Sequence, residues 1–150
     1  MPKTIEMIVS LKVPDTTAIT TLQTLQKIGF EQIQDVKRAD YYKFLIDGDT
    51  EKFKDKISKV DILVNANKHF FSFSMKKNDN VLVLVKNIDD GSGILSTLKN
   101  RLGFNNIKKV EKAVLWSLEI DAEENEARKI AERAAKDLLV NENYQEFEVL

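Results

Sequence analysis

Residues 63–67 read Leu-Val-Asn-Ala-Asn, and residues 139–143, which lie 76 positions later, read Leu-Val-Asn-Glu-Asn. Two further pairs recur in the same order at a displacement of 74: Gly29-Phe30 returns as Gly103-Phe104, and Ile46-Asp47 returns as Ile120-Asp121. Ordered matches at a nearly constant spacing indicate an internal repeat. The chain is therefore predicted to contain two copies of one unit, at 1–75 and 81–150, joined by the polar connector 76–80.

The first copy alternates between strand and helix patterns. Asp15 is a predicted helix N-cap and Gly29 is predicted to end that helix, while Ala39-Asp40 is expected to form a tight turn. The predicted elements in chain order are a strand at 5–13, a helix between Asp15 and Gly29, strands at 31–37 and 41–46, a helix at 53–64 and a strand at 71–73.

The second copy repeats this order, with predicted strands at 81–85, 107–110, 114–120 and 147–150 and two helices between them. A β-α-β-β-α-β unit closes most simply as an antiparallel sheet with both helices on one face. The predicted fold class is α+β: a tandem pair of β-α-β-β-α-β units, with antiparallel sheets and helices on one face, related as a pseudo-dimer.

Composition excludes several classes of function. The 150 residues include no cysteine, so the chain has no disulfide, no thiolate metal site and no cysteine nucleophile. Residues up to position 75 include 11 basic and 10 acidic side chains, and the rest include 12 basic and 14 acidic ones. Neither half has the concentrated positive charge that nucleic acid or an anionic membrane requires, and the longest apolar run is only Val81–Val85. A cytoplasmic protein without nucleic-acid or membrane partners is expected.

Few residues suggest catalysis. His69 is the only histidine, it begins a predicted strand, and its counterpart in the second copy is Gln145, so we interpret it as an ordinary strand-edge residue. The acidic run at 121–126 begins a predicted helix, where negative charge is favoured by the exposed N–H groups. The glycine turn at Asp89 to Gly93 is a weaker anion-site candidate, and the first copy has no glycine there. No metal and no cofactor is expected.

Four aromatic side chains lie on predicted middle strands of the two copies. Few basic residues lie among them, so they are expected to fill a core or an interface rather than to stack on bases. They are Tyr41, Tyr42, Phe44 and Trp116.

The residues around the repeat anchors resemble one family, PurS, the small subunit of phosphoribosylformylglycinamidine synthase. In the first copy the resemblance rests on Ile28-Gly29-Phe30, Asp35-Val36-Lys37, Ile62-Leu63-Val64-Asn65 and Phe71-Ser72-Phe73. In the second copy it rests on Leu102-Gly103-Phe104, Leu138-Leu139-Val140-Asn141 and Phe147-Glu148-Val149.

The resemblance implies an accessory subunit with no activity of its own. PurS subunits form dimers that bridge the ATP-dependent synthetase (PurL-type) and the glutaminase (PurQ-type) in purine synthesis, and larger single-chain enzymes begin with two fused PurS-like units. ATP and formylglycinamide ribonucleotide (FGAR) would then bind to a partner, and a homodimer of this chain is possible. The candidate partner-interface residues are Lys37, Arg38, Asn65, Asn67, Asn141 and Asn143.

The chain departs from the family pattern at several positions. Ala39-Asp40 and Ala113-Val114 replace a Gly-Lys pair, and Ala66 and Glu142 replace a proline. In the family's Asp-Val-Arg motif, the Arg is replaced by Lys37 in the first copy and by Glu111 in the second, where Lys109 also replaces the Asp. Two alternatives stay open on the sequence: a tandem ACT-like regulatory module that binds a small molecule at Asp89 to Gly93, and a structural interaction protein outside metabolism.

Overall fold

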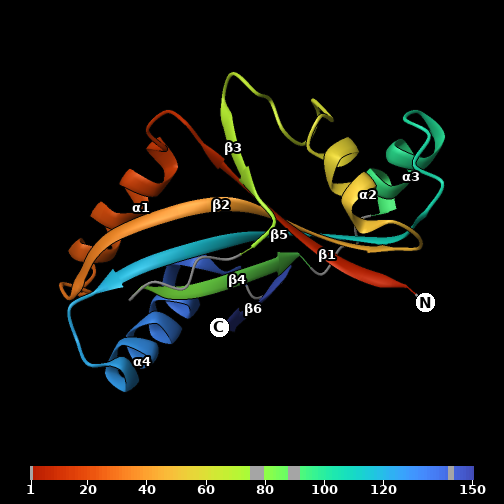
Figure 1. Ribbon diagram of the computed structural model, residues 1–150. Helices are drawn as coiled ribbons and strands as arrows, with labels where there is room; N and C mark the ends of the chain where they lie inside the picture. The colour runs from red at the N-terminus through yellow and green to blue at the C-terminus, as the bar shows by residue number, and fades with distance from the viewer. Residues whose placement is uncertain (1, 75–79, 88–91, 142–143) are drawn as a thin grey trace. The chain divides into compact units, whose positions relative to one another are not determined.

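The computed structural model describes residues 2–74, 80–87, 92–141 and 144–150 (Figure 1). Within these ranges the strands form a six-stranded sheet in the order β3-β1-β2-β5-β4-β6, and the α+β class is confirmed. The elements are β1 (Lys3–Leu11), α1 (Thr16–Lys27), β2 (Ile33–Ile46), α2 (Thr50–Ile57), β3 (His69–Ser72), β4 (Val81–Asn87), α3 (Ser92–Asn100), β5 (Ile107–Ile120), α4 (Glu124–Ala134), the π-helical turn η1 (Ala135–Leu139) and β6 (Gln145–Val149).

The expected turn at Ala39-Asp40 and the expected break between strands 107–110 and 114–120 are both wrong. β2 and β5 each run without interruption for 14 residues through these positions, and Asp40 pairs with Val9 in the β1–β2 ladder. Two-residue hairpin turns need residues with positive φ, and no non-glycine residue in the described ranges has one. Because neither position holds a glycine, each pair of predicted middle strands is one long strand.

The continuous strands change which residues pack together. The chain divides into two compact units: unit 1 contains Met1–Val13, Asp40–Met75 and Asp89–Lys112, and unit 2 contains Pro14–Ala39, Lys76–Ile88 and Ala113–Leu150. Both β2 and β5 contribute residues to both units. Each unit therefore combines elements from both halves of the sequence. The division into two repeat copies at 1–75 and 81–150 stays a prediction.

Unit 1 contains β1, β3, the end of β2, the start of β5, and helices α2 and α3. β1 pairs antiparallel with β2 and with β3, with Met7 opposite Tyr42. Side chains from α2 and α3 belong to the same core cluster, which includes Phe53 and Leu98. Because alternate strand residues point to opposite faces, both helices of this unit cover one face of its strands.

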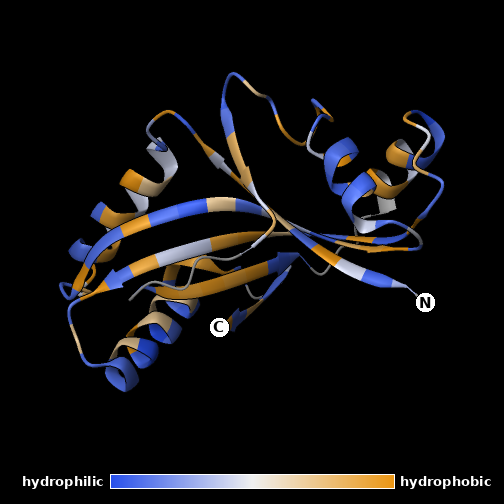
Figure 2. Cartoon of the chain, in the orientation of Figure 1, coloured by the Kyte–Doolittle hydropathy of each residue, from blue (hydrophilic) through white to orange (hydrophobic). Residues whose placement is uncertain are grey.

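Unit 2 contains α1, the start of β2, β4, the end of β5, α4, η1 and β6. β4 is hydrophobic along most of its length (Figure 2) and pairs antiparallel with both β5 and β6. Leu25 of α1 and Ile130 of α4 lie in one core cluster with Val83. The first helix of the chain therefore packs with elements of the second half.

The predicted helix end at Gly29 is confirmed, and its counterpart Gly103 follows a helix in the same way. Gly29 and Gly103 have φ values of 112° and 75°, in the region where a side chain is disfavoured. The residue after each glycine donates its N–H to a helix carbonyl: Phe30 to Leu25 and Phe104 to Leu98, each at 3.0 Å. No helix in the described part of the chain is both long and apolar enough to span a bilayer.

Candidate functional site

The repeated Leu-Val-Asn segment forms the same turn in both units. The carbonyl of Asn65 accepts from the N–H groups of Lys68 and His69, and the carbonyl of Asn141 accepts from those of Tyr144 and Gln145, at 2.8–2.9 Å in every case. The N–H of Asn65 donates to Nδ1 of His69, and the N–H of Asn141 donates to Oε1 of Gln145, both at 3.0 Å.

In the first copy, His69 stabilises this turn by accepting a hydrogen bond from the N–H of Asn65. Imidazole nitrogen and amide oxygen both accept one hydrogen bond at the start of the closing strand, which explains why glutamine replaces histidine in the second copy. The predicted strand-edge position of His69 is confirmed, since it is the first residue of β3.

The described asparagine candidates, Asn65, Asn67 and Asn141, lie in or beside these turns. Oδ1 of Asn65 accepts from the N–H of Asn67 at 3.0 Å, which shapes the turn, while the Asn67 and Asn141 side chains are exposed. Asn143 and the neighbouring Glu142 lie outside the described residues. A role in partner binding stays a prediction for all four candidate asparagines, and the contacts of Asn65 already explain its presence.

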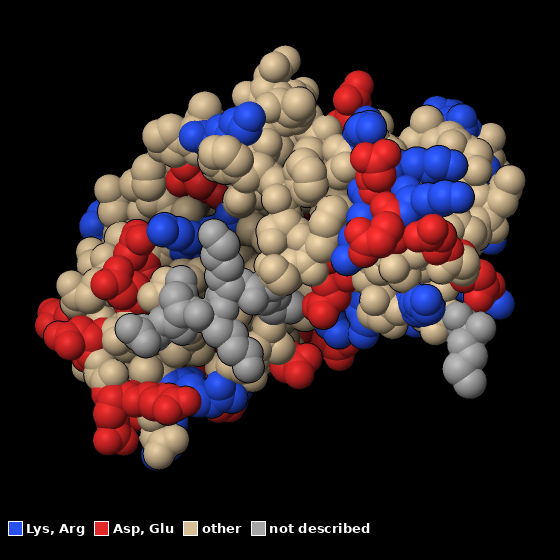
Figure 3. Space-filling view, in the orientation of Figure 1, with Lys and Arg blue, Asp and Glu red and all other residues tan. Residues whose placement is uncertain are grey.

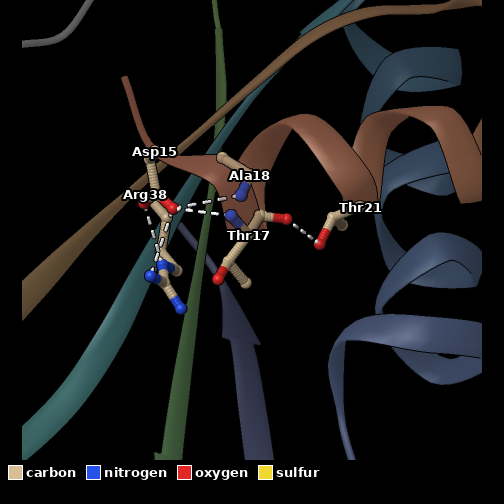
Figure 4. A network of polar contacts seen from close by, with 5 residues as sticks. All are labelled: Asp15, Thr17, Ala18, Thr21 and Arg38. Atoms are coloured by element: carbon tan, nitrogen blue, oxygen red, sulfur yellow. Dashed lines mark hydrogen bonds and ion pairs between the residues drawn. The ribbon is translucent and has the colours of Figure 1, made fainter. Parts of the chain in front are cut away.

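Arg38 is occupied by contacts within unit 2 (Figure 4). Asp15 caps α1 by accepting from the N–H groups of Thr17 and Ala18 at 3.0 and 3.2 Å. The guanidinium of Arg38 donates to both oxygens of the same carboxylate, at 3.0 and 3.2 Å, and lies 6.0 Å from the ring centroid of Trp116. This bidentate pair links the start of α1 to β2.

Lys37 has a different environment from its neighbour. It follows Val36 of the unit 2 core, and its side chain is exposed on β2. One hydrogen bond joins two of the candidates directly, from the N–H of Asn67 to Oδ1 of Asn65. The described candidates are divided between the two units, and a role of the exposed Lys37 in partner binding stays a prediction.

The four aromatic residues predicted to fill a core do so. Phe44 is fully buried, and Tyr41, Tyr42 and Trp116 are nearly so. The Tyr41 hydroxyl donates to Glu6 at 2.6 Å. Burial, together with the negative charge of Asp40, raises the pKa of Tyr42 to about 12.

One cavity in unit 1 combines charges of both signs. It has a volume of about 330 Å³ and lies beside the start of α2. Its acidic groups are already engaged, since Asp47 pairs with Lys108 at 3.2 Å and Asp49 caps α2. The lining residues are Asp47, Gly48, Asp49, Lys52, Phe53, Lys56, Leu102, Gly103, Phe104 and Asn106.

The remaining candidates for catalysis also lie where the local structure explains them. Glu124 and Glu126 lie in the first turn of α4, where the helix dipole favours them. In the described ranges no group of three or more His, Asp or Glu side chains is arranged to hold a metal ion. Most of the glycine turn at Asp89 to Gly93 lies outside the described residues.

On the face drawn in Figure 3, acidic and basic side chains are interspersed.

The antiparallel six-stranded sheet and its helices define an α+β protein with a ferredoxin-type fold. Residues 81–150 match the family model of PurS, phosphoribosylformylglycinamidine (FGAM) synthase. The match lies in the second of the two predicted copies and agrees with the resemblance seen in the sequence. No match to the chain was found among curated proteins.

Proposed function

We propose that the chain is a non-catalytic subunit of FGAM synthase that bridges the ATP-dependent synthetase (PurL-type) and the glutaminase (PurQ-type) in purine synthesis. The observation that carries the proposal is the match of residues 81–150 to the PurS family. In this role the chain works in the cytoplasm and holds two enzymes together, while ATP, FGAR and glutamine bind to the partners.

The chemistry of the side chains supports an accessory role. Glutamine hydrolysis in this enzyme class needs a cysteine nucleophile, and the sequence has no cysteine. The only histidine accepts a hydrogen bond from the N–H of Asn65 and lies at the start of a strand. Asp15 caps a helix, Asn65 shapes a turn, and Arg38 links β2 to the start of α1.

We also propose that residues 1–75 form a second unit of the same kind. The hydrogen bonds at Asn65 and His69 recur at Asn141 and Gln145, and both halves have a helix that ends at a glycine with positive φ. Matched core positions support the same conclusion, because Ile33 and Val36 of β2 correspond to Ile107 and Val110 of β5. One chain would then supply what two PurS subunits supply together.

Reconstitution tests the bridging role. The chain is mixed with candidate synthetase and glutaminase subunits, and glutamine-dependent amidation of FGAR is measured with and without it. We expect glutamine-dependent turnover only when all three components are present, while ammonia-dependent turnover by the synthetase is less affected. Equal glutamine-dependent rates without the chain, together with no detectable complex, would contradict the proposal.

Lys37 gives a point test of the interface. Reversing an exposed charge at an interface slows association and weakens binding, whereas reversal elsewhere does not. Lys37→Glu is expected to weaken assembly about tenfold, and Lys129→Glu on the exposed side of α4 serves as the matched control. Equal affinities for the two variants would remove Lys37 from the interface.

A further inference from the structure

The two edge strands of the sheet have opposite character. β3 and β6 are the outermost strands in the sheet order. On β3, Phe70 and Phe71 are 59% and 48% exposed, and the strand itself has no acidic or basic residue apart from His69. On β6, the exposed side chains of Glu146 and Glu148 alternate with half-buried apolar ones. Exposed aromatic residues on an edge strand are normally avoided, because such an edge can pair with another chain.

Backbone pairing shows which groups face away from the sheet. Lys12 donates its N–H to the carbonyl of Lys68, and the same register places Ser10 opposite Phe70. Hydrogen-bonded pairs in an antiparallel ladder recur at every second residue, so the N–H and C=O of Phe71 point outward. On β6, Leu150 donates to Leu82, and the same rule points the backbone of Phe147 outward.

Side chains on the two edges also match by face. Phe71 lies opposite the core residue Val9, and Phe147 packs against the core of unit 2, so both lie on the helix-covered face of their strands. Phe70 and the two glutamates lie on the other face. If β3 of one copy lay beside β6 of another, aromatic side chains would meet on one face. On the other face, acidic side chains would lie near basic ones.

Basic residues border β3 on its open face. The ammonium of Lys12 lies 5.2 Å from the ring centroid of Phe70, and Lys68 is exposed directly before the strand. On the opposite edge Lys86 lies across from Glu146, whereas Glu148 lies across from Leu84. Glu148 therefore has no compensating charge directly opposite it in the ladder, and it is the main acidic partner available to β3.

We propose that β3 of one copy pairs antiparallel with β6 of a second copy, so that Phe71 lies opposite Phe147 and Lys12 and Lys68 lie near Glu148. Charge selects this pairing over the symmetric ones. Two β3 edges would bring lysines together and two β6 edges would bring glutamates together, and like charges across an interface are destabilising. The contact is head-to-tail, so each dimer keeps one free edge of each kind and association can continue unless the geometry closes.

Sedimentation of the purified chain tests this pairing without any enzyme subunit, so its outcome is independent of the proposed function. The wild-type chain is expected to associate with rising concentration, and more weakly at high salt. Glu146→Lys/Glu148→Lys is expected to lower the association constant about tenfold or more, because attraction becomes repulsion. Glu124→Lys/Glu126→Lys on α4 makes the same change in net charge away from the edge and should behave like the wild type.

Charge reversal on the other edge distinguishes head-to-tail from symmetric pairing, because a symmetric contact involves only one kind of edge and would respond to reversal on that edge alone. Lys12→Glu/Lys68→Glu alone should also associate weakly, and circular dichroism checks that it is folded, since Lys12 bonds to the carbonyl of Ala66. Mixing the two charge-reversed variants should restore association, because every β3 then meets a β6 of opposite charge. A wild-type chain that stays monomeric at all concentrations, or a Glu146→Lys/Glu148→Lys variant that associates as the wild type does, would overturn the proposal.

Discussion

The two compact units fill their cores with different side chains. Unit 1 contains a chain of aromatic contacts in which Phe44 lies 5.2 Å from Phe53 and Phe53 lies 6.0 Å from Phe104, measured between ring centroids. In unit 2 the corresponding helix presents small residues to its core. These are Ala127, Ala131 and Ala134 of α4, followed by Ala135 of η1.

The difference follows from the helices. α2 has only 8 residues, and its two buried side chains are the large Phe53 and Ile57. α4 has 11 residues and buries several alanines, which allow a helix backbone to approach its strands closely. Protein interiors are packed to a nearly constant density, so a short helix with large side chains and a longer helix with small ones can cover similar sheets. Unit 1 should therefore be most sensitive to the loss of side-chain volume, and unit 2 to its addition.

Removing volume from unit 1 should have the largest effect. Phe53→Ala deletes a fully buried ring that contacts two others, and it is expected to lower the free energy of unfolding by about 3–5 kcal/mol. Ile62→Ala, at a position 60% exposed, is the control and should change it by less than about 0.5 kcal/mol. Urea denaturation measures the free energy of unfolding of both variants. Similar values for the two variants would show that the aromatic contacts do not stabilise unit 1.

Adding volume to unit 2 should also destabilise the protein. Ala131 is fully buried, so Ala131→Leu forces large atoms into a packed region and is expected to cost about 1–3 kcal/mol. Lys129→Leu lies on the exposed side of the same helix and should cost under about 0.5 kcal/mol. The comparison of the cores fails if Ala131→Leu stabilises the chain, because that outcome would reveal unfilled space beside α4.

Alkaline pH should weaken unit 1 through Tyr42. Its pKa is raised to about 12 in the folded chain, against about 10 in the unfolded chain. Between these values the unfolded chain loses the proton first, so stability is complete below pH 10 and declines as the pH rises towards 12. Denaturation across this range should show a loss of roughly 1–2 kcal/mol in the wild type relative to Tyr42→Phe. Parallel pH profiles for the two proteins would contradict this role.

The smallest effects should come from the matched turns. His69→Ala and Gln145→Ala each remove the acceptor for an asparagine N–H and should each cost about 1 kcal/mol. His69→Gln gives the first turn the acceptor of the second and should cost less than about 0.5 kcal/mol. Thermal denaturation compares the three variants. A His69→Gln variant as unstable as His69→Ala would show that the two turns are not equivalent.

Local chemistry made much of the fold predictable. Asp15 was identified as an N-cap and Gly29 as a helix end because short-range hydrogen bonding and positive φ depend on neighbouring residues alone. The predicted turn at Ala39-Asp40 was wrong because the polar Asp40 interrupts the apolar pattern without supplying the positive φ that a hairpin turn needs. Hydrophobic periodicity is also a local signal, so it could not show that α1 packs with β4 rather than with β1.

The candidate site was less predictable than the fold. The environments of Asn65 and Arg38 depend on contacts over different distances along the chain. Asn65 bonds to residues two to four positions away, which the repeated segment already suggested. Arg38 bonds to Asp15, 23 positions earlier, and no spacing in the sequence indicates that pair. The positions of β3 and β6 at the two edges of the sheet also depend on long-range packing, so the sequence alone does not indicate them.

Hydrogen exchange of the Ala131→Leu variant tests most directly whether each compact unit is built from both halves of the chain. Ala131 lies in the same core cluster as Leu25 of α1, whereas Phe53 of α2 belongs to the other cluster. We expect the amides of α1 to lose protection together with those of α4, while α2 and α3 keep theirs. Loss of protection throughout 81–150, including α3, with full protection retained throughout 1–75, would contradict the composite units.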